Sequence, residues 1–182
     1  MFASPADVVS IRSMIAVCSI TRVAETVAAV RARRLLSLIA DGATVTRPPG
    51  IAPNDHLVLR FHDIAEPLLG YVPPSESHVA DALAFAAASD EPIVVHCYAG
   101  VSRSTAMAYA IACAREPRRD EAELAQSLRR LSPTATPNRL IVRLADRALG
   151  REGRMAAAIE AIGRGVDAYE GEPFSLCPRS PA

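Results

Sequence analysis

In the first half of the chain, short apolar runs alternate with segments of helical spacing. Each run is rich in leucine or β-branched side chains and is bounded by turn-forming residues, a pattern typical of buried strands. These predicted strands occupy residues 14–20, 34–40, 56–61 and 92–96. Helical spacing follows the first run over 21–34, where Thr21 is a candidate N-cap, and precedes the last run over 73–89.

The second half of the chain is predicted to be mainly helical. Helices are expected over 102–115, 120–131, 137–149 and 152–169. Because parallel neighbours require crossover connections, strands that alternate with helices predict an α/β fold, with a small, mostly parallel central sheet of about four strands flanked by helices. Residues 1–170 are predicted to form a single domain, and the proline-rich 171–182 a loose C-terminal tail.

Composition fits this picture and narrows the choice of partners. The chain has 182 residues, 50 % of them hydrophobic, and a formal net charge of zero, so attraction to nucleic acid or to anionic membranes is not expected. The arginine-rich stretches 30–34 and 129–131 are predicted to be solvated helix faces. No stretch is apolar enough for a membrane helix, and the N-terminus, which carries Asp7 and no basic start, does not resemble a signal peptide. The sequence therefore predicts a cytoplasmic protein without membrane or nucleic-acid partners.

The four cysteines lie far apart and form no C-x-x-C pair, so neither a disulfide framework nor a zinc ribbon is indicated. Cys18 and Cys113 fall within a predicted strand and a predicted helix, where a cysteine is usually a small buried hydrophobe. Cys177 lies in the predicted tail. The histidines match no metal-ligand spacing, so no metal or other cofactor is expected.

Cys97 occupies a different kind of position, at the carboxyl end of the fourth predicted strand. In an open parallel sheet, ligands bind beyond such ends, where the strand-to-helix loops gather. Here "YAGVSR" leads directly into a helix, so backbone N–H groups can point inward while the helix N-terminus adds positive partial charge. We predict that a tetrahedral oxyanion binds to this loop, which consists of Tyr98, Ala99, Gly100, Val101, Ser102 and Arg103.

Two loop residues and the thiol have distinct predicted roles. Gly100 lets the turn adopt a conformation that is closed to residues with a Cβ. Arg103 offers a planar fork for two equatorial oxygens. The positive partial charge at the helix N-terminus favours the thiolate over the thiol, so Cys97 is predicted to be an ionised nucleophile. A nucleophile at the floor of an anion-binding site is the arrangement needed for in-line attack on phosphorus. Such an attack would form a phosphocysteine intermediate.

Residues 96–104, "HCYAGVSRS", resemble the His-Cys-x5-Arg-Ser/Thr signature of the cysteine-dependent protein tyrosine and dual-specificity phosphatases. The resemblance implies the phosphatase-type fold and a two-step mechanism without metal. It also implies that Ser104 hydrogen-bonds the thiolate expelled in the second step, and that His96 orients the loop and helps to keep the thiol ionised. A second similarity lies in 131–149, which looks like the Arg-Pro-x-x-x-Pro-Asn segment and final helix of dual-specificity phosphatases, with Ser132 in place of the arginine.

The predicted reaction also needs an acid, because an alkoxide or phenolate leaves poorly without a proton. Asp63 follows the strand predicted over 56–61, and parallel strands bring that loop to the same sheet edge as Cys97. An aspartate on a mobile loop upstream of the cysteine has this role in the family that the chain resembles, and Asp63 fits that placement. Asp55 lies before the strand, at the wrong end, and Glu66 is a reserve candidate.

These observations predict a metal-independent protein phosphatase for phosphotyrosine, with phosphoserine and phosphothreonine as further candidates. A phosphoinositide or RNA 5′-phosphatase is an alternative, which the uncharged residues at loop positions 98, 99, 101 and 102 disfavour. A rhodanese-type sulfurtransferase or arsenate reductase fits the Gly100 and Arg103 register less well. A catalytically silent module that binds phosphoproteins is a third alternative, although such a module would be expected to have lost Cys97 or Arg103.

Overall fold

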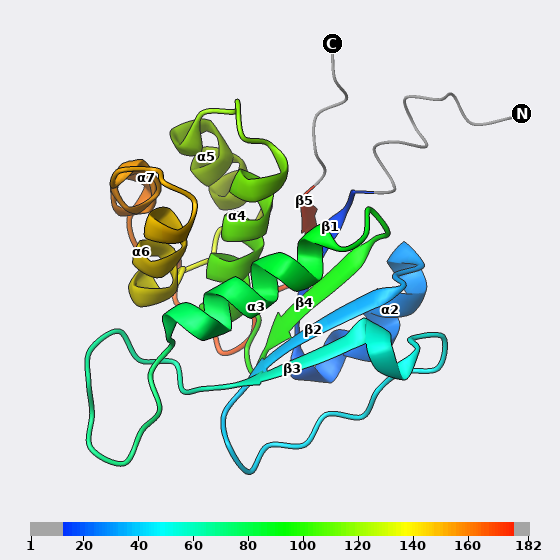
Figure 1. Ribbon diagram of the computed structural model, residues 1–182. Helices are drawn as coiled ribbons and strands as arrows, with labels where there is room; N and C mark the ends of the chain where they lie inside the picture. Colours follow the sequence, from blue (N-terminus) through cyan, green and yellow to red (C-terminus); the bar gives the residue numbers. More distant parts are fainter. Residues whose placement is uncertain (1–12, 177–182) are drawn as a thin grey trace, which may run out of the picture.

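The computed structural model describes residues 13–176 (Figure 1). The N-terminal stretch that carries Asp7, and the tail residue Cys177, lie outside the described residues, so the predictions made for them stay predictions. Within 13–176, no helix is long and apolar enough to span a membrane.

A five-stranded sheet runs through the centre of the protein in the order β3-β2-β4-β1-β5. The four predicted strands are present, each within one residue of its expected limits, and they pair in parallel. They are β1 (Ile15–Ser19), β2 (Arg34–Ile39), β3 (His56–Arg60) and β4 (Ile93–Cys97). The predicted α/β class, with a mostly parallel sheet, is therefore confirmed.

The fifth strand, β5 (Phe174–Leu176), corrects the predicted start of the loose tail. It pairs antiparallel with β1, with Phe174 opposite Val17 and Leu176 opposite Ile15. Residues 171–176 are therefore part of the sheet or of its immediate approach, and the tail can begin only after Leu176. The reason is that a strand of only three residues is too short to leave a recognisable alternating pattern in the sequence.

Helices surround the sheet on both faces. They are α2 (Val23–Val30), α3 (Glu76–Ala87), α4 (Arg103–Arg115), α5 (Glu121–Leu131), α6 (Arg139–Ala148) and α7 (Arg154–Ile162), with short 3₁₀ turns η1 (Ile20–Arg22) and η2 (Pro53–Asp55). Side chains of Ser75, Asp120 and Asn138 cap α3, α5 and α6. Two expectations were wrong: Thr21 lies within η1 and does not cap α2, and α7 ends at Ile162 because Gly163 adopts a positive φ of 65°.

The core has two parts, one on each face of the sheet. Strand residues such as Cys18 and Val94 pack with Val23 and Val27 of α2, while the other strand face packs with α3, α4 and α6. Figure 1 shows α4 lying across the larger face between α3 and α5. Every residue of α4 from Arg103 to Cys113 is buried, and alternating alanines let its neighbours approach closely. The beginning of α4 is therefore fixed firmly beneath its preceding loop.

Two arginines predicted to lie on solvated helix faces are instead engaged with the protein. Arg34 begins β2, has only 6 % of its surface exposed and stacks on the ring of Phe85 at 3.8 Å. Arg129 of α5 donates at 2.8 Å to the carbonyls of Pro133, Ala135 and Gly163. Clusters of charge in a sequence do not reveal which members reach carbonyls of distant segments.

Candidate phosphate-binding active site

Cys97 is the last residue of β4, which lies between β1 and β2 in the sheet. Because all four parallel strands end at the same edge, the loops after β1, β3 and β4 gather there. The loop 98–102 turns directly into α4. Gly100 makes that turn possible: its φ is +73°, and a Cβ added there would lie 2.8 Å from backbone atoms of Cys18 and Ser19. Only glycine fits this position without displacing β1.

Four carbonyl oxygens of the loop are held from outside by three other segments of the chain. The pairs are Tyr98 O with Ile20 N (3.1 Å), Ala99 O with Gly171 N (2.9 Å), Val101 O with Thr136 N (2.9 Å), and Ser102 O with Asn138 N (3.3 Å). In a trans peptide, a C=O and the N–H that follows it point in opposite directions. Outward carbonyls therefore aim the amides of Ala99, Gly100, Ser102 and Arg103 toward the inside of the loop, as the sequence predicted.

The thiol of Cys97 lies at the floor of this loop. Only 2 % of the Cys97 surface is exposed, and its Sγ lies 3.2 Å from the hydroxyl oxygen of the buried Ser104. This places the predicted nucleophile and its predicted hydroxyl partner in contact. Burial raises the pKa of the other two described cysteines, Cys18 and Cys113, to about 12, which keeps both as thiols.

His96 orients the loop from beneath, through a chain of hydrogen bonds. Its Nδ1 lies 3.3 Å from the carbonyl of Cys97, an atom that can only accept, so Nδ1 carries the proton. Its Nε2 must then accept from Ser37 Oγ at 2.7 Å, and Ser37 in turn accepts from His56 Nε2 at 2.8 Å. Burial lowers the pKa of His96 to about 4. His96 is therefore neutral near pH 7, so it can support a thiolate only by orienting the loop, as the family resemblance implied, and not through a charge of its own.

Arg103 is the first residue of α4 and is 7 % exposed. Its Nη1 donates to the carbonyl of Phe61 at 3.0 Å, which fixes the plane of the guanidinium. Its Nε has no hydrogen-bond partner among residues 13–176 and lies 3.9 Å from Asp63 Oδ2. A buried guanidinium with unused donors beside inward amides is suited to two oxygens of a bound oxyanion.

The structure brings Asp63, and neither of the other two carboxylates considered, to the loop. Asp63 Oδ1 accepts from Ser102 Oγ at 2.7 Å and from Asn138 Nδ2 at 2.8 Å. Asp55 lies before β3 and faces Arg34 at 3.7 Å, and the exposed Glu66 pairs with Arg143. Asp63 is thus held over the loop by the loop itself and by the cap of α6.

Several residues that shape the site were not assigned by the sequence. Ser37 and His56 support His96, and Asn138 holds Asp63 while it also caps α6. Next to Ser132, Arg129, one turn earlier on α5, donates to carbonyls of the segment that follows. The "PN" pair within 131–149 was the one sequence signal that pointed to Asn138.

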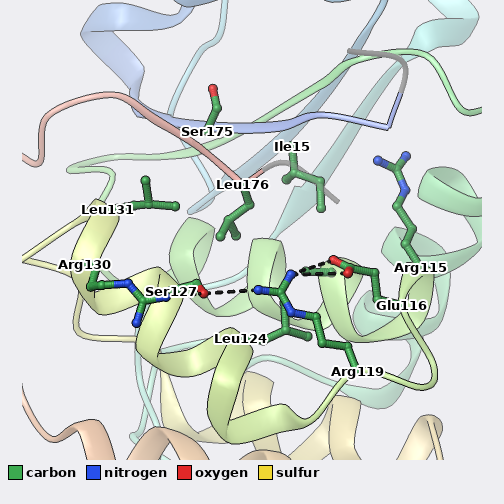
Figure 2. A pocket seen from close by; sticks show the side chains of 11 residues that line it. Ile15, Arg115, Glu116, Arg119, Leu124, Ser127, Arg130, Leu131, Ser175 and Leu176 are labelled. Atoms are coloured by element: carbon green, nitrogen blue, oxygen red, sulfur yellow. Dashed lines mark hydrogen bonds and ion pairs between the residues drawn. The ribbon is translucent and has the colours of Figure 1, made fainter. Parts of the chain in front are cut away.

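A pocket of about 360 Å³ lies elsewhere, at the opposite end of α4 (Figure 2). Figure 2 shows Arg119 reaching between Glu116 and Ser127, to both of which it donates. Its described lining contains neither cysteine nor histidine. Within residues 13–176, no group of three or more His, Cys, Asp or Glu side chains is placed to hold a metal ion. The reactive groups that the chain brings together are those around Cys97.

The α/β fold is of the phosphatase type, and comparisons with solved structures agree. The structure resembles that of DUSP15, with a TM-score of 0.59 at 15 % identity over 81 % of this chain and 90 % of that one. It also resembles Cydia Pomonella PTP-2 phosphatase (TM-score 0.57, 20 % identity, 73 % and 84 % covered) and PTPMT1 in complex with PI(5)P (0.53, 14 %, 78 % and 87 %). No curated protein matches the chain in sequence.

Residues 69–134, which contain the loop, match the family model described as protein-tyrosine phosphatase. Together with the fold, this match confirms the resemblance to the cysteine-dependent protein tyrosine and dual-specificity phosphatases.

Proposed function

We propose that this protein hydrolyses phosphotyrosine on proteins through a phosphocysteine intermediate and without metal, and that phosphoserine and phosphothreonine are further substrates. The observation that carries the proposal is the loop 98–103, whose carbonyls are held outward above the Cys97 sulfur while the donors of Arg103 remain available. Such a cradle stabilises charge that develops on a phosphoryl group during transfer. We further propose that the protein acts in the cytoplasm on phosphorylated protein partners.

In the first step, the Cys97 thiolate attacks phosphorus while the bond between phosphorus and the leaving oxygen breaks. Asp63 donates a proton to that oxygen, so the product leaves as a neutral alcohol or phenol. Arg103 and the inward amides hold the three equatorial oxygens throughout.

In the second step, water attacks phosphorus and the Asp63 carboxylate accepts its proton. The bond between phosphorus and sulfur breaks, inorganic phosphate forms, and the thiolate returns. Ser104, 3.2 Å from the sulfur, donates a hydrogen bond to the departing thiolate. The reaction needs no redox partner and no second substrate besides water.

A phosphoinositide substrate is less favoured. PTPMT1 has been solved with PI(5)P, but likeness at 14 % identity shows the fold alone. The loop side chains Tyr98, Ala99, Val101 and Ser102 add no positive charge, whereas a polyphosphorylated ring would favour basic residues there.

The test is hydrolysis of p-nitrophenyl phosphate and of a phosphotyrosine peptide in the presence of a chelator. We expect turnover by the unmodified protein and none by Cys97→Ser, which should still bind the peptide. Cys113→Ser is the matched control and should retain turnover, because Cys113 is buried in α4 away from the loop. Full activity in Cys97→Ser would refute the assignment, and peptide binding without any phosphate release by the unmodified protein would support a silent binding module instead.

A further inference from the structure

Residues 165–171, which we call the strap, pass behind the phosphate-binding loop between α7 and β5. Figure 1 shows this chain, orange to red, running below α4 toward β5. The strap is fixed first to the segment that follows α5: Gly165 N donates to Thr136 Oγ1 at 3.1 Å, and Val166 N donates to the Pro133 carbonyl at 3.0 Å. It then reaches the loop itself, where Gly171 N donates to the carbonyl of Ala99 at 2.9 Å.

The two glycines of the strap lie close to the backbone of neighbouring segments, where a side chain is excluded at Gly165 and crowded at Gly171. A Cβ at Gly165 would lie 2.5 Å from the carbonyl carbon of Thr134. A Cβ at Gly171 would lie 3.2 Å from the carbonyl oxygen of Gly100 and 3.3 Å from a methyl carbon of Val101. Neither glycine has a positive φ, so close approach and not backbone conformation is what requires glycine here. The strap is therefore packed directly against the back of the loop.

Glu170 ties the strap to the strand end beside the nucleophile. Its Oε1 accepts hydrogen bonds from the hydroxyls of Ser19 and Thr21. Ser19 is fully buried, and its Cα is the partner of Cys97 in the pairing of β1 with β4. The two hydroxyl donors lower the pKa of Glu170, so its carboxylate is charged near neutral pH and accepts from both.

We propose that Glu170 and Gly171 are positioning residues for the oxyanion site, acting through the loop backbone. This inference rests on the proposed phosphatase function of the same site. Gly171 holds the Ala99 carbonyl outward, and the Gly100 amide of the same planar peptide unit consequently points at the bound oxyanion. Glu170 prevents the strap from moving away from the loop. Neither side chain touches the substrate, so the expected effect is on the affinity of the loop for oxyanions.

The experiment compares Glu170→Ala and Gly171→Ala with Glu172→Ala in the full chain. Glu172 is the matched control: it is an exposed glutamate two residues along the same segment, and its ion pair is with Arg22 at 3.6 Å, away from the loop. The measurement is the Kd of tungstate, a tetrahedral dianion, by titration calorimetry well below the melting temperature of each variant. KM and kcat for p-nitrophenyl phosphate are measured alongside.

We expect the Kd for tungstate and the KM to rise about tenfold in Glu170→Ala and Gly171→Ala, because one charge-assisted amide contact is misaligned. Glu172→Ala should match the unmodified protein, and Glu170→Gln, which keeps one oxygen acceptor, should restore part of the affinity. Tungstate affinity that is unchanged in both strap variants, or lowered equally in Glu172→Ala, would overturn the inference. If the unmodified protein binds tungstate but hydrolyses nothing, the proposed function fails while the tungstate comparison still decides the role of the strap.

Discussion

An arginine lies near a cysteine at each end of α4, but the two pairs differ in what they can still do. At the N-terminal end, Arg103 donates to one carbonyl and keeps an unused Nε, with Cys97 below it. At the C-terminal end, Arg115 donates to the carbonyls of Ser13, Ala86 and Ser89 at 2.9, 3.1 and 3.3 Å. Cys113 nearby is a buried thiol whose pKa is raised to about 12.

The polarity of the helix contributes to this difference. Free N–H groups and positive partial charge gather at a helix N-terminus, while free C=O groups and negative partial charge gather at its C-terminus. Arg115, at the C-terminal end, is used up by carbonyls of Ser13 and of the end of α3, whereas Arg103 lies at the end whose free N–H groups favour an anion. The end of α4 at which an arginine lies thus bears on whether it serves structure or chemistry.

The largest expected effect comes from exchanging each arginine for lysine. Arg103→Lys should lower kcat/KM about 10²- to 10³-fold, because an ammonium group cannot grip two phosphoryl oxygens in one plane. Arg115→Lys should keep kcat/KM within about threefold and instead lower the free energy of unfolding by about 1–2 kcal/mol, through lost bonds to carbonyls. Steady-state kinetics and urea unfolding of both variants provide the measurement. Similar losses of kcat/KM in the two variants would remove the proposed distinction between the two ends.

The N-terminal end of α4 was the part of the site that the sequence predicted best. A β-branched run that ends in Cys97 and a glycine loop that opens a helix are local signals, so strand, loop and helix start could all be placed from neighbouring residues. The four parallel strands were likewise predicted from local signals, namely the short apolar runs themselves. Asp63 could also be predicted, because the carboxyl ends of all strands in a parallel sheet lie at the same edge.

What the sequence did not reveal depends on pairing between distant segments. Ser37 contacts His96 only because β2 pairs with β4 in this register. The order of strands in a sheet cannot be predicted from the sequence of either strand. Gly171 reaches Ala99 only because the chain returns to the far edge of the sheet after α7. The alanine-rich spacing after residue 152 concealed that return, since it continued the helical pattern past Gly163.

A smaller effect on catalysis is expected from substituting Asp63, which lies over the N-terminal end of α4 but belongs to the loop after β3. Asp63→Asn should lower kcat for a phosphotyrosine peptide about 10²-fold, because a phenolate of high pKa needs a proton as it leaves. The loss should be several-fold smaller for p-nitrophenyl phosphate, whose leaving group departs without one. Asp55→Asn is the matched control, since Asp55 lies before β3 beside Arg34, and it should not change kcat. Equal losses for both substrates in Asp63→Asn would argue against a role as general acid.

The smallest expected effect concerns the layer beneath the loop, where His96 is buried and neutral. Its pKa in the folded protein is about 4, below the ordinary value of 6.5, because burial disfavours the charged ring. The stability that this shift represents is present above about pH 6.5 and is lost as the pH falls toward 4, since the unfolded chain then binds a proton that the folded one does not.

Urea unfolding between about pH 7.5 and about pH 5 should therefore show a loss of roughly 2 kcal/mol from His96 alone. Burial also lowers the pKa of His56 and of His78, so both add losses of the same sign, and the useful quantity is the difference between the unmodified protein and His96→Gln. That variant should be less stable at neutral pH but should lose less stability on acidification. Parallel pH profiles for the two proteins would show that His96 is not held neutral beneath the loop, and the direction of the proton in the chain from His56 through Ser37 would then have to be reassigned.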